Sequence, residues 1–276
     1  MSDTAKNDDR YTVPALARGL QLLMQFNRDE RELSGAELSR RLGLPRASVF
    51  RMLFTLEQGG FVERAEDGVS YRLGLAVLRL GFELLASMEL TEHGRPVIEA
   101  LRDRCGYSAH IVVRDAREVV FIAKAAGRSA LFHSIQVGAR LPAHATVLGR
   151  LLLADMDLDA LRQLYPQEPL QAFTPRTPTT LVQLKALIEE DRARGHGVSM
   201  GGFETGISTN AAPVFNDRGD VAAAVSISVP AQRIDEQALP PLVAMVCDAA
   251  SQLTERISHL PSRGGWAQKN TEQKKP

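Results

Sequence analysis

The sequence predicts an α+β protein in two parts: an N-terminal winged helix-turn-helix domain and a C-terminal domain with a mostly antiparallel sheet. A helix-turn-helix pattern followed by a strand hairpin occupies residues 34–73. A strongly apolar helical stretch follows at 74–88. Alternating strand segments, separated by turns and flanked by helical segments, then fill most of 107–229. Helices beside an antiparallel sheet define an α+β domain.

Length and composition fit a protein of two globular domains. The chain has 276 residues with no formal net charge, and 44% of them are hydrophobic, which suffices for an ordinary core. It contains no apolar run long enough to span a membrane, and its polar, acidic N-terminus does not resemble a signal peptide. We therefore expect a cytoplasmic protein without membrane contact. Residues 1–11 and 261–276 are expected to be disordered, and Cys105 and Cys247 to be buried thiols.

The first helix is expected from Thr12 to about Arg28, because Pro14 suits the first turn of a helix. It is expected to complete a three-helix core. The apolar residues expected on its core side are Leu16, Leu20, Leu23 and Met24.

Two short helices joined by a tight turn come next. Ser34 and Glu37 match a capping box, in which the serine oxygen accepts an amide proton at the helix start and the glutamate reaches back. Gly43 suits the left-handed residue that ends this helix. Pro45 suits the first turn of a second helix, which is expected to run to about Glu57. This is the pattern of a helix-turn-helix.

The second helix has a core side and an outward side when its residues are placed 100° apart. The residues expected on the core side are Val49, Phe50, Leu53 and Leu56. Small residues and one arginine fall opposite, which lets a DNA major groove approach closely. Between Leu33 and Leu56, four arginines and one glutamate leave a net charge of +3 in an otherwise neutral chain.

A strand hairpin follows the second helix. Residues 60–64 and 69–73 read as strands joined by a turn that ends in Asp67-Gly68, which is the wing of a winged helix-turn-helix. We therefore assign 12–73 to a domain that binds double-stranded DNA. The residues expected at the DNA are Arg40, Arg41, Arg46, Ala47, Ser48, Arg51, Thr55, Arg64 and Arg72.

Residues 74–90 are expected to form a linker and dimerisation helix. A helix with two apolar stripes needs packing partners on two sides. A dimer also suits a protein that reads two half-sites about 34 Å apart. One stripe comprises Leu75, Leu78, Phe82 and Leu85, and the other Val77, Leu80, Leu84 and Met88.

Residues 91–260 are expected to form the second domain. Its predicted strands are Tyr107–Arg114, Glu118–Ala125, Ala130–Val137, Gly197–Met200, Ile207–Phe215 and Val221–Val229. Its predicted helices are Thr91–Cys105, Thr146–Met156, Asp157–Leu164, Thr180–Arg194 and Ala231–Leu260, with a loop at 138–142. Ser226 and Ser228 lie two apart on a strand and share a face. Such a face suits either the wall of a pocket or plain exposure to solvent.

Several separate stretches resemble bacterial IclR-type transcriptional regulators. The similarity runs from about Val13 to Leu260. The stretches that carry it are 43–51 (GLPRASVFR), 71–74 (YRLG), 138–145 (GARLPAHA), Gly149-Arg150, Glu204, Gly206 and Ala212-Pro213. The resemblance implies a winged helix-turn-helix joined to a GAF-like effector-binding domain, assembled as dimers or dimers of dimers. It also implies control of an operon for the catabolism of small organic acids or aromatic compounds, and no enzymatic activity or cofactor.

The resemblance also implies the lining of an effector pocket. Carried onto this chain, the lining residues are Val147, Leu148, Ser199, Thr209, Ser226 and Ser228. Bulky Val147 and Leu148 and neutral Ser199 disfavour a two- or three-carbon acid, so we expect an aromatic or longer carboxylic acid. Hydroxyls and backbone amides can hold its carboxylate. Arg150 replaces the lysine that is common in the family. A ligand that prefers one arrangement of the dimer would shift the two DNA-binding domains.

Other functional classes have weaker sequence support. Residues 197–201 match the G-x-S-x-G motif of serine hydrolases around Ser199, but a charged helix precedes it and glycines follow it. His110, His133, His144 and Cys105 lack the spacing of metal ligands, and His110 is expected as a hydrogen-bonded core residue. Gly201-Gly202 lacks the lysine of a phosphate loop. The outward side of the second helix is intact, which argues against a sensor that has lost DNA binding.

Overall fold

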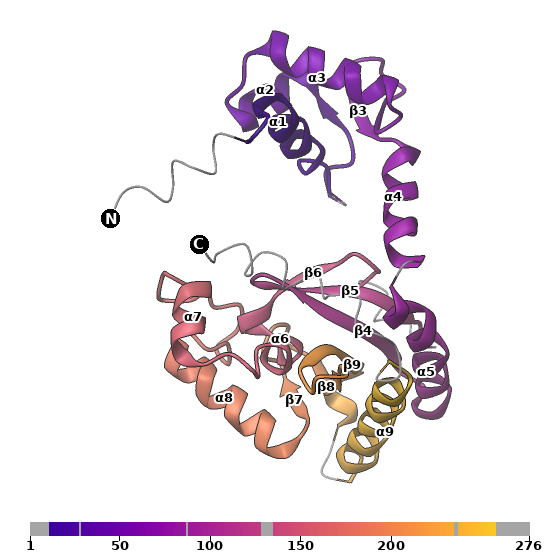
Figure 1. Cartoon of the computed structure of the whole chain (residues 1–276), viewed down its shortest axis with the longest axis vertical. Helices are drawn as coiled ribbons and strands as arrows, with labels where there is room; N and C mark the ends of the chain where they lie inside the picture. The colour runs from indigo at the N-terminus through magenta and orange to yellow at the C-terminus, as the bar shows by residue number, and fades with distance from the viewer. Residues whose placement is uncertain (1–10, 28, 87, 128–134, 235–236, 258–276) are drawn as a thin grey trace. The chain divides into compact units, whose positions relative to one another are not determined.

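The computed structural model describes residues 11–27, 29–86, 88–127, 135–234 and 237–257. The chain forms two compact units, Met1–Ser87 and Met88–Pro276, each considered by itself below (Figure 1). No helix among the described residues is long and apolar enough to cross a membrane.

The first unit is a winged helix-turn-helix domain followed by one further helix. Its three-stranded antiparallel sheet has the order β1-β3-β2, in which β2 and β3 form the wing. The elements are α1 (Pro14–Leu23), β1 (Leu33–Ser34), α2 (Gly35–Leu42), α3 (Arg46–Gln58), β2 (Val62–Arg64), β3 (Ser70–Leu73) and α4 (Leu75–Ala86).

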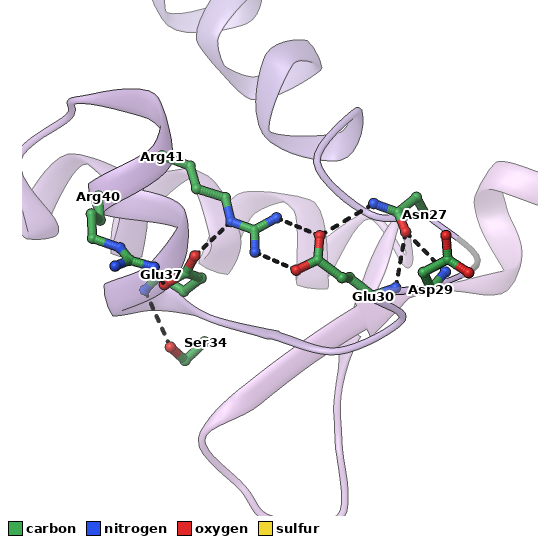
Figure 2. Close-up of polar contacts among 7 residues, drawn as sticks. All are labelled: Asn27, Asp29, Glu30, Ser34, Glu37, Arg40 and Arg41. Carbon is green, nitrogen blue, oxygen red and sulfur yellow. Dashed lines mark hydrogen bonds and ion pairs between the residues drawn. The ribbon is translucent and has the colours of Figure 1, made fainter. Parts of the chain in front are cut away.

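Helix α2 begins and ends where its capping residues dictate. The side-chain oxygen of Ser34 accepts a hydrogen bond from the backbone amide of Glu37 at 3.2 Å. Gly43 ends the helix in the left-handed region at φ 64°, where a Cβ would be strained. The second half of the expected capping box is absent among the described contacts, because the Glu37 carboxylate turns to Arg40 and Arg41 instead (Figure 2).

The core of the winged domain differs from the expected one at several positions. Leu22 and Phe26 enter the core, and Leu23 packs at its edge. Phe50 is 58% exposed, because it lies 100° around α3 from buried Val49 and outside the arc set by Val49 and Leu53. The placement of Phe50 in the core was therefore wrong. The expected core residues in the first helix and at its end that lie exposed instead are Leu16, Leu20 and Met24.

Helix α4 is apolar, yet none of its described residues is buried. Gly74 precedes it and lies so close to the backbone oxygen of Gly60 that a Cβ there would approach to 2.3 Å. This close approach fixes where the chain leaves the wing. The large apolar side chains that α4 exposes are Leu75, Leu78, Leu80, Phe82 and Leu84.

The second unit is a six-stranded sheet with helices on both faces (Figure 1). Its helices are α5 (Glu89–Cys105), α6 (Val147–Leu152), α7 (Leu158–Leu164), α8 (Leu181–Arg194) and α9 (Leu239–Ile257), with short 3-10 helices at Ala143–Ala145 and Ala231–Arg233. Its strands are β4 (Ser108–Asp115), β5 (Glu118–Ala125), β6 (Arg140–Pro142), β7 (Gly197–Met200), β8 (Ile207–Phe215) and β9 (Val221–Pro230).

The sheet has the order β6-β5-β4-β9-β8-β7, and every described strand pair is antiparallel. Helices α5 and α9 pack side by side against one face, and α6 packs against the other, with α8 behind it (Figure 1). Side chains alternate between the faces. Ile111 points toward α5, since a Cβ on Gly94 would meet it at 2.2 Å, whereas Val112 joins the core around α6.

Some expected elements changed at their ends. The strand expected at 130–137 falls largely on residues outside the described ranges, and a short strand, β6, occupies part of the expected loop. The expected C-terminal helix is divided into a 3-10 turn at Ala231–Arg233 and α9. Cys105 and Cys247 are free thiols that are only partly buried, and burial raises the pKa of each above its usual value.

Candidate DNA-binding face and ligand cavity

The outward face of α3 combines cationic, small and aromatic side chains. Ala47, Arg51 and Phe54 are exposed on it, and Phe50 flanks them. The hydroxyl of Thr55 is directed back to the carbonyl of Arg51 at 2.9 Å, so it is already engaged within the helix. This face therefore offers an arginine, a shallow small-residue surface and two aromatic rings.

The arginines expected at the DNA fall into two groups. Arg46 and Arg51 make no ion pair with any residue that the structure describes. Arg40 and Arg41 both donate to Glu37 at 2.6 Å, and Arg41 also donates to both oxygens of Glu30 at 2.6 and 2.8 Å (Figure 2). Arg41 is therefore held by two carboxylates, and its charge is neutralised within the domain.

The turn before β1 presents Glu30 to Arg41. The side-chain oxygen of Asn27 accepts hydrogen bonds from the backbone amides of Asp29 and Glu30, both at 2.9 Å (Figure 2). Hydrogen bonds from Arg41 and from Asn27 lower the pKa of Glu30 to about 2. Glu30 therefore stays ionised, and remains paired with Arg41, throughout the physiological range.

The two expected wing contacts are also paired. Arg64 donates to Glu57 at 3.1 Å and lies over the ring of Tyr71. Arg72 donates to Glu63 at 2.7 Å, which raises the pKa of the arginine. Both arginines remain nearly half exposed. Both keep guanidinium N–H groups that these bonds do not use, although the paired carboxylates weaken the attraction of each arginine for a phosphate.

A partly open cavity of about 50 Å³ lies between the sheet and the α6 side of the second unit. Among the lining residues expected from the resemblance, Val147, Leu148, Ser199, Thr209 and Ser228 line this cavity. Ser226 does not appear in the lining. The structure thus brings together residues from α6, β7, β8 and β9.

The strand register explains how the hydroxyls gather. Ser228 pairs with Thr209 on one side and with Ser108 on the other, and Thr209 pairs with Ser199. This hydroxyl row, Ser108-Ser228-Thr209-Ser199, crosses four neighbouring strands on the face that α6 covers. The Ser108 oxygen is occupied, because it accepts from the amide of Gly127 at 3.0 Å.

A buried pair of threonines holds one wall of the cavity. Thr174 donates to the carbonyls of Gly201 and Gly202, and Thr177 donates to the carbonyl of Gly202 at 2.9 Å. The amide of Gly202 in turn donates to the Ser199 oxygen at 3.2 Å. Ser199 is therefore fixed in place and keeps its hydroxyl proton for another partner.

Aromatic and charged residues near the cavity were missed in the sequence. Phe121 and Phe203 line it, and Phe203 packs against Phe173 with ring centroids 4.9 Å apart. Glu204 lines its exposed side. The ammonium of Lys124 donates to the carbonyl of Ile135, itself a lining residue, at 2.5 Å. Phe121 and Lys124 are three residues apart on β5, and the irregular β4–β5 register between them breaks the two-residue alternation, so no sequence pattern placed both near the cavity.

A buried ion pair joins α6 to α8. Arg150, with its side chain only 8% exposed, donates to Asp191 of α8 at 2.6 Å, and Asp191 is 1% exposed. Arg194 approaches the other oxygen of Asp191 at 3.1 Å. Gly149 allows α6 to approach the preceding turn, because a Cβ there would lie 2.0 Å from the carbonyl of Ala143. Arg150 is thus a structural residue that holds the cavity wall formed by α6.

The geometry around Ser199 does not match a nucleophile elbow. Ser199 lies inside β7 and is followed by bends that lead into β8, whereas the hydrolase motif needs a strand, a sharp turn and a helix. A catalytic triad would also need a histidine after Ser199 in the sequence, and His259, which is in that part of the sequence, lies outside the described residues. His110 is buried, but no hydrogen-bond partner reaches its ring among the described residues, so the expected core hydrogen bond was wrong. Within those residues no three potential metal ligands lie together.

Comparison with known proteins decides the family. A family model described as the IclR helix-turn-helix domain matches residues 15–66, and one described as bacterial transcriptional regulator IclR C-terminal matches 82–255. The chain belongs to the IclR family. Members of this family are DNA-binding, ligand-responsive transcriptional regulators rather than enzymes, so the hydrolase alternative is wrong.

Named IclR-family relatives cover most of the chain. The Pca regulon regulatory protein of Pseudomonas putida is 34% identical over 247 residues, covering 87% of this chain and 84% of the relative. The HTH-type transcriptional regulator XynR of Escherichia coli K12 is 30% identical over 230 residues, covering 82% and 90% respectively. The winged and effector domains therefore occur together in these relatives.

Solved IclR-family structures share the fold. A transcriptional regulator from Rhodococcus sp. RHA1 superposes with a TM-score of 0.79 at 31% identity, covering 91% of this chain and all of that one. An IclR homologue from Microbacterium hydrocarbonoxydans, solved in complex with 4-hydroxybenzoate, superposes with a TM-score of 0.77 at 27% identity, covering 89% and 99%. The α+β fold with an N-terminal winged helix-turn-helix is thereby confirmed.

Proposed function

We propose that this IclR-family regulator binds an operator of two half-sites as a dimer or a dimer of dimers, and controls a catabolic operon in response to an aromatic carboxylic acid. The cavity carries the proposal, because it combines hydroxyl groups on one wall with phenylalanine rings on others. Aromatic walls suit a flat ring, and hydroxyls suit the oxygens of an acid.

The proposed DNA contacts are centred on α3. Arg46 and Arg51 are exposed and lack ion-pair partners among the described residues, so they are available to bases or phosphates. Ala47 leaves room for the groove beside them. Arg41 is assigned a positioning role in place of direct contact, since Glu30 and Glu37 occupy its guanidinium. The remaining residues proposed at the DNA are Arg40, Ser48, Thr55, Arg64 and Arg72.

The proposed dimer contact is α4. Exposed Leu75, Leu80 and Phe82 give this helix an apolar surface that a second copy of the chain would cover. A symmetric dimer presents two winged domains, which matches an operator with two half-sites.

The proposed effector is a carboxylic acid longer than three carbons. Ser199, Thr209 and Ser228 supply hydroxyls, and the cation of Lys124 lies behind the lining residue Ile135. Val147 and Leu148 give the lining apolar surface, which suits the hydrocarbon part of a longer acid better than a two-carbon acid. The relative named for the Pca regulon and the neighbour solved with 4-hydroxybenzoate favour an aromatic acid among these.

Regulation is proposed to work by linkage. An acid that binds one arrangement of the dimer more tightly shifts the population toward that arrangement, and with it the affinity for the operator. The same coupling accounts for repression or activation, depending on which arrangement binds DNA.

A thermal-shift screen of the purified full-length protein tests the effector. The screen uses small carboxylates, aromatic acids and ring-cleavage products, and a ligand at a hundred times its dissociation constant adds about 2.7 kcal/mol to stability. We expect an aromatic acid to raise the melting temperature and to change the affinity for an operator selected from random DNA. The response should be lost in a Thr209→Val, Ser228→Ala double variant.

A matched control removes a serine hydroxyl outside the cavity. Ser208, on the same strand as Thr209, is buried on the opposite face of the sheet, so a Ser208→Ala variant should respond like the wild type. Specific operator binding without a shift from any acid would overturn the acid assignment. A shift that survives in the double variant would overturn the cavity assignment.

A further inference from the structure

A second polar row lies beside the hydroxyl row of the cavity. His110 of β4 pairs with Lys124 of β5 on one side and with Ser226 of β9 on the other. Ser226 precedes the lining residue Ser228 by two positions, so both point to the face that α6 covers. The row Lys124-His110-Ser226 therefore lies next to the hydroxyl row on the same face of the sheet. On β4 and β9 the two rows are two residues apart.

Two members of this second row are buried without hydrogen-bond partners. His110 and Ser226 are each 1% exposed. Within the described chain no partner reaches either ring nitrogen of His110 or the oxygen of Ser226. Buried polar atoms are nearly always paired, because leaving them unpaired destabilises the fold. These three atoms, on two facing residues, can therefore bind a hydrogen-bonding group of a ligand.

The unpaired atoms adjoin the cavity. The ring of Phe121, which lines the cavity, meets the ring of His110 edge-on with centroids 5.4 Å apart. Ser228, also a lining residue, stands next to Ser226 on the same face of β9. Phe121 and Ser228 are thus the lining residues that lie between this pair and the cavity.

We propose that His110 and Ser226 form a subsite for an uncharged hydroxyl group of the effector, at the opposite end of the ligand from its carboxylate. The inference rests on the proposed function and narrows the ligand class to hydroxylated aromatic acids.

The chemistry of the pair selects a hydroxyl over a second carboxylate. Burial, together with the charge of Lys124, lowers the pKa of His110 to about 4, so the ring is neutral and one nitrogen is a bare acceptor. A hydroxyl can donate to that nitrogen and accept from Ser226. An ionised carboxylate could accept from Ser226 and from the ring N–H, but it would leave the acceptor nitrogen unpaired and would bring a full charge into a buried site, which costs more than burying a neutral hydroxyl.

Calorimetric titration of the full-length protein with benzoate and with the 2-, 3- and 4-hydroxybenzoates tests the subsite. At least one hydroxybenzoate should bind about three- to tenfold more tightly than benzoate, as expected for a net hydrogen bond. Ser226→Ala should reduce this preference to within about twofold. His110→Phe, which removes both nitrogens, should have the same effect.

Ser208→Ala is the matched control. Ser208 is also a fully buried serine whose oxygen has no partner among the described residues, but it points to the opposite face of the sheet. The control variant should keep the full preference for the hydroxylated acid. If His110→Phe fails to fold, the comparison of Ser226→Ala with Ser208→Ala decides the question alone.

Phenol and toluene separate this inference from the proposed acid effector. Acids that bind with equal affinity whether or not they carry a hydroxyl would overturn the subsite and leave the acid assignment standing. Phenol that binds more tightly than toluene in a Ser226-dependent manner, without binding of any acid, would support the subsite and overturn the acid. A preference that persists in Ser226→Ala, or no binding of acids and phenol alike, contradicts the subsite.

Discussion

The DNA-binding face of α3 and the cavity of the second unit use polar groups in opposite ways. On the winged domain the charges are exposed, and acids of the same domain already neutralise several of them, as Glu30 and Glu37 do for Arg41. Beside the cavity, His110 and Ser226 are buried and keep unused hydrogen-bonding capacity. At the exposed site, the charges that have no ion-pair partner are the ones available to DNA. At the buried site, the polar atoms that have no hydrogen-bond partner in the protein are the ones available to a ligand.

The largest expected effect comes from breaking the buried ion pair beneath α6. Asp191→Ala leaves the guanidinium of Arg150 buried without its partner, which should destabilise the second unit by about 3–5 kcal/mol. Denaturant unfolding of the full-length protein measures this loss. The proposed DNA contacts of Arg51 involve neither Asp191 nor Arg150. The loss of unfolding free energy therefore reports on the buried ion pair alone.

An exposed ion pair provides the control for Asp191. Asp159 pairs with Arg162 at 2.8 Å, and both side chains are more than half exposed. Asp159→Ala should therefore change stability by less than about 1 kcal/mol. Equal losses from the two aspartates would show that burial does not distinguish them.

Arg51→Ala should weaken operator binding by about 1–3 kcal/mol if the guanidinium contacts a base edge. Contact with a phosphate instead predicts a smaller loss, equal for all sequences, and a shallower salt dependence. Fluorescence anisotropy on operator and random DNA at several salt concentrations separates the two cases. Because Arg51 is exposed, the melting temperature of the Arg51→Ala variant should stay near the wild-type value.

Arg162→Ala serves as the control for Arg51, because Arg162 is an exposed arginine in the second unit. It should leave the affinity for DNA unchanged. An Arg51→Ala protein that binds every DNA as tightly as the wild type would remove α3 from the DNA contact.

The smallest expected effect is the pH response of the Glu30 ion pair. The pKa of Glu30 is lowered from 4.5 to about 2, so the pair contributes stability that is fully present above about pH 4.5 and is lost as the pH falls toward 2. The stability difference between the wild type and Glu30→Gln should therefore shrink over that interval. Thermal melts between pH 2 and 6 measure it, and high salt should reduce it because the pair is exposed.

Glu32→Gln is the neighbouring control for Glu30, because Glu32 is an exposed acid two residues further along. The difference in melting temperature between Glu32→Gln and the wild type should stay constant across the same pH range. A Glu30→Gln difference that grows as the pH falls would have the wrong sign for a carboxylate of lowered pKa.

Features set by neighbouring residues, such as helix boundaries, could be predicted from the sequence. Contacts between residues far apart in the sequence could not. Ser34, Gly43 and Thr180 act on neighbouring backbone atoms, so their helix boundaries could be predicted from the sequence. Glu30 and Arg41 are eleven residues apart, and no pattern in the sequence links them. Phe50 was misplaced because a helical wheel gives relative angles but not the direction of the core.

The cavity shows the same division between local and long-range information. Its serine and threonine positions followed from the family resemblance. Phe121, Phe203 and Lys124 could not be placed, because their position at the cavity depends on strand order and on packing around the turns. The unpaired atoms of His110 and Ser226 depend on the same register, and they became visible only with the sheet assembled.

The most direct test of the account is a measurement of linkage between acid and operator. The affinity for the selected operator is measured with and without a saturating aromatic acid, and the affinity for the acid is measured with and without the operator. The account predicts that both affinities change by the same factor, clearly different from one. An acid that binds in the cavity but leaves the operator affinity unchanged would contradict it.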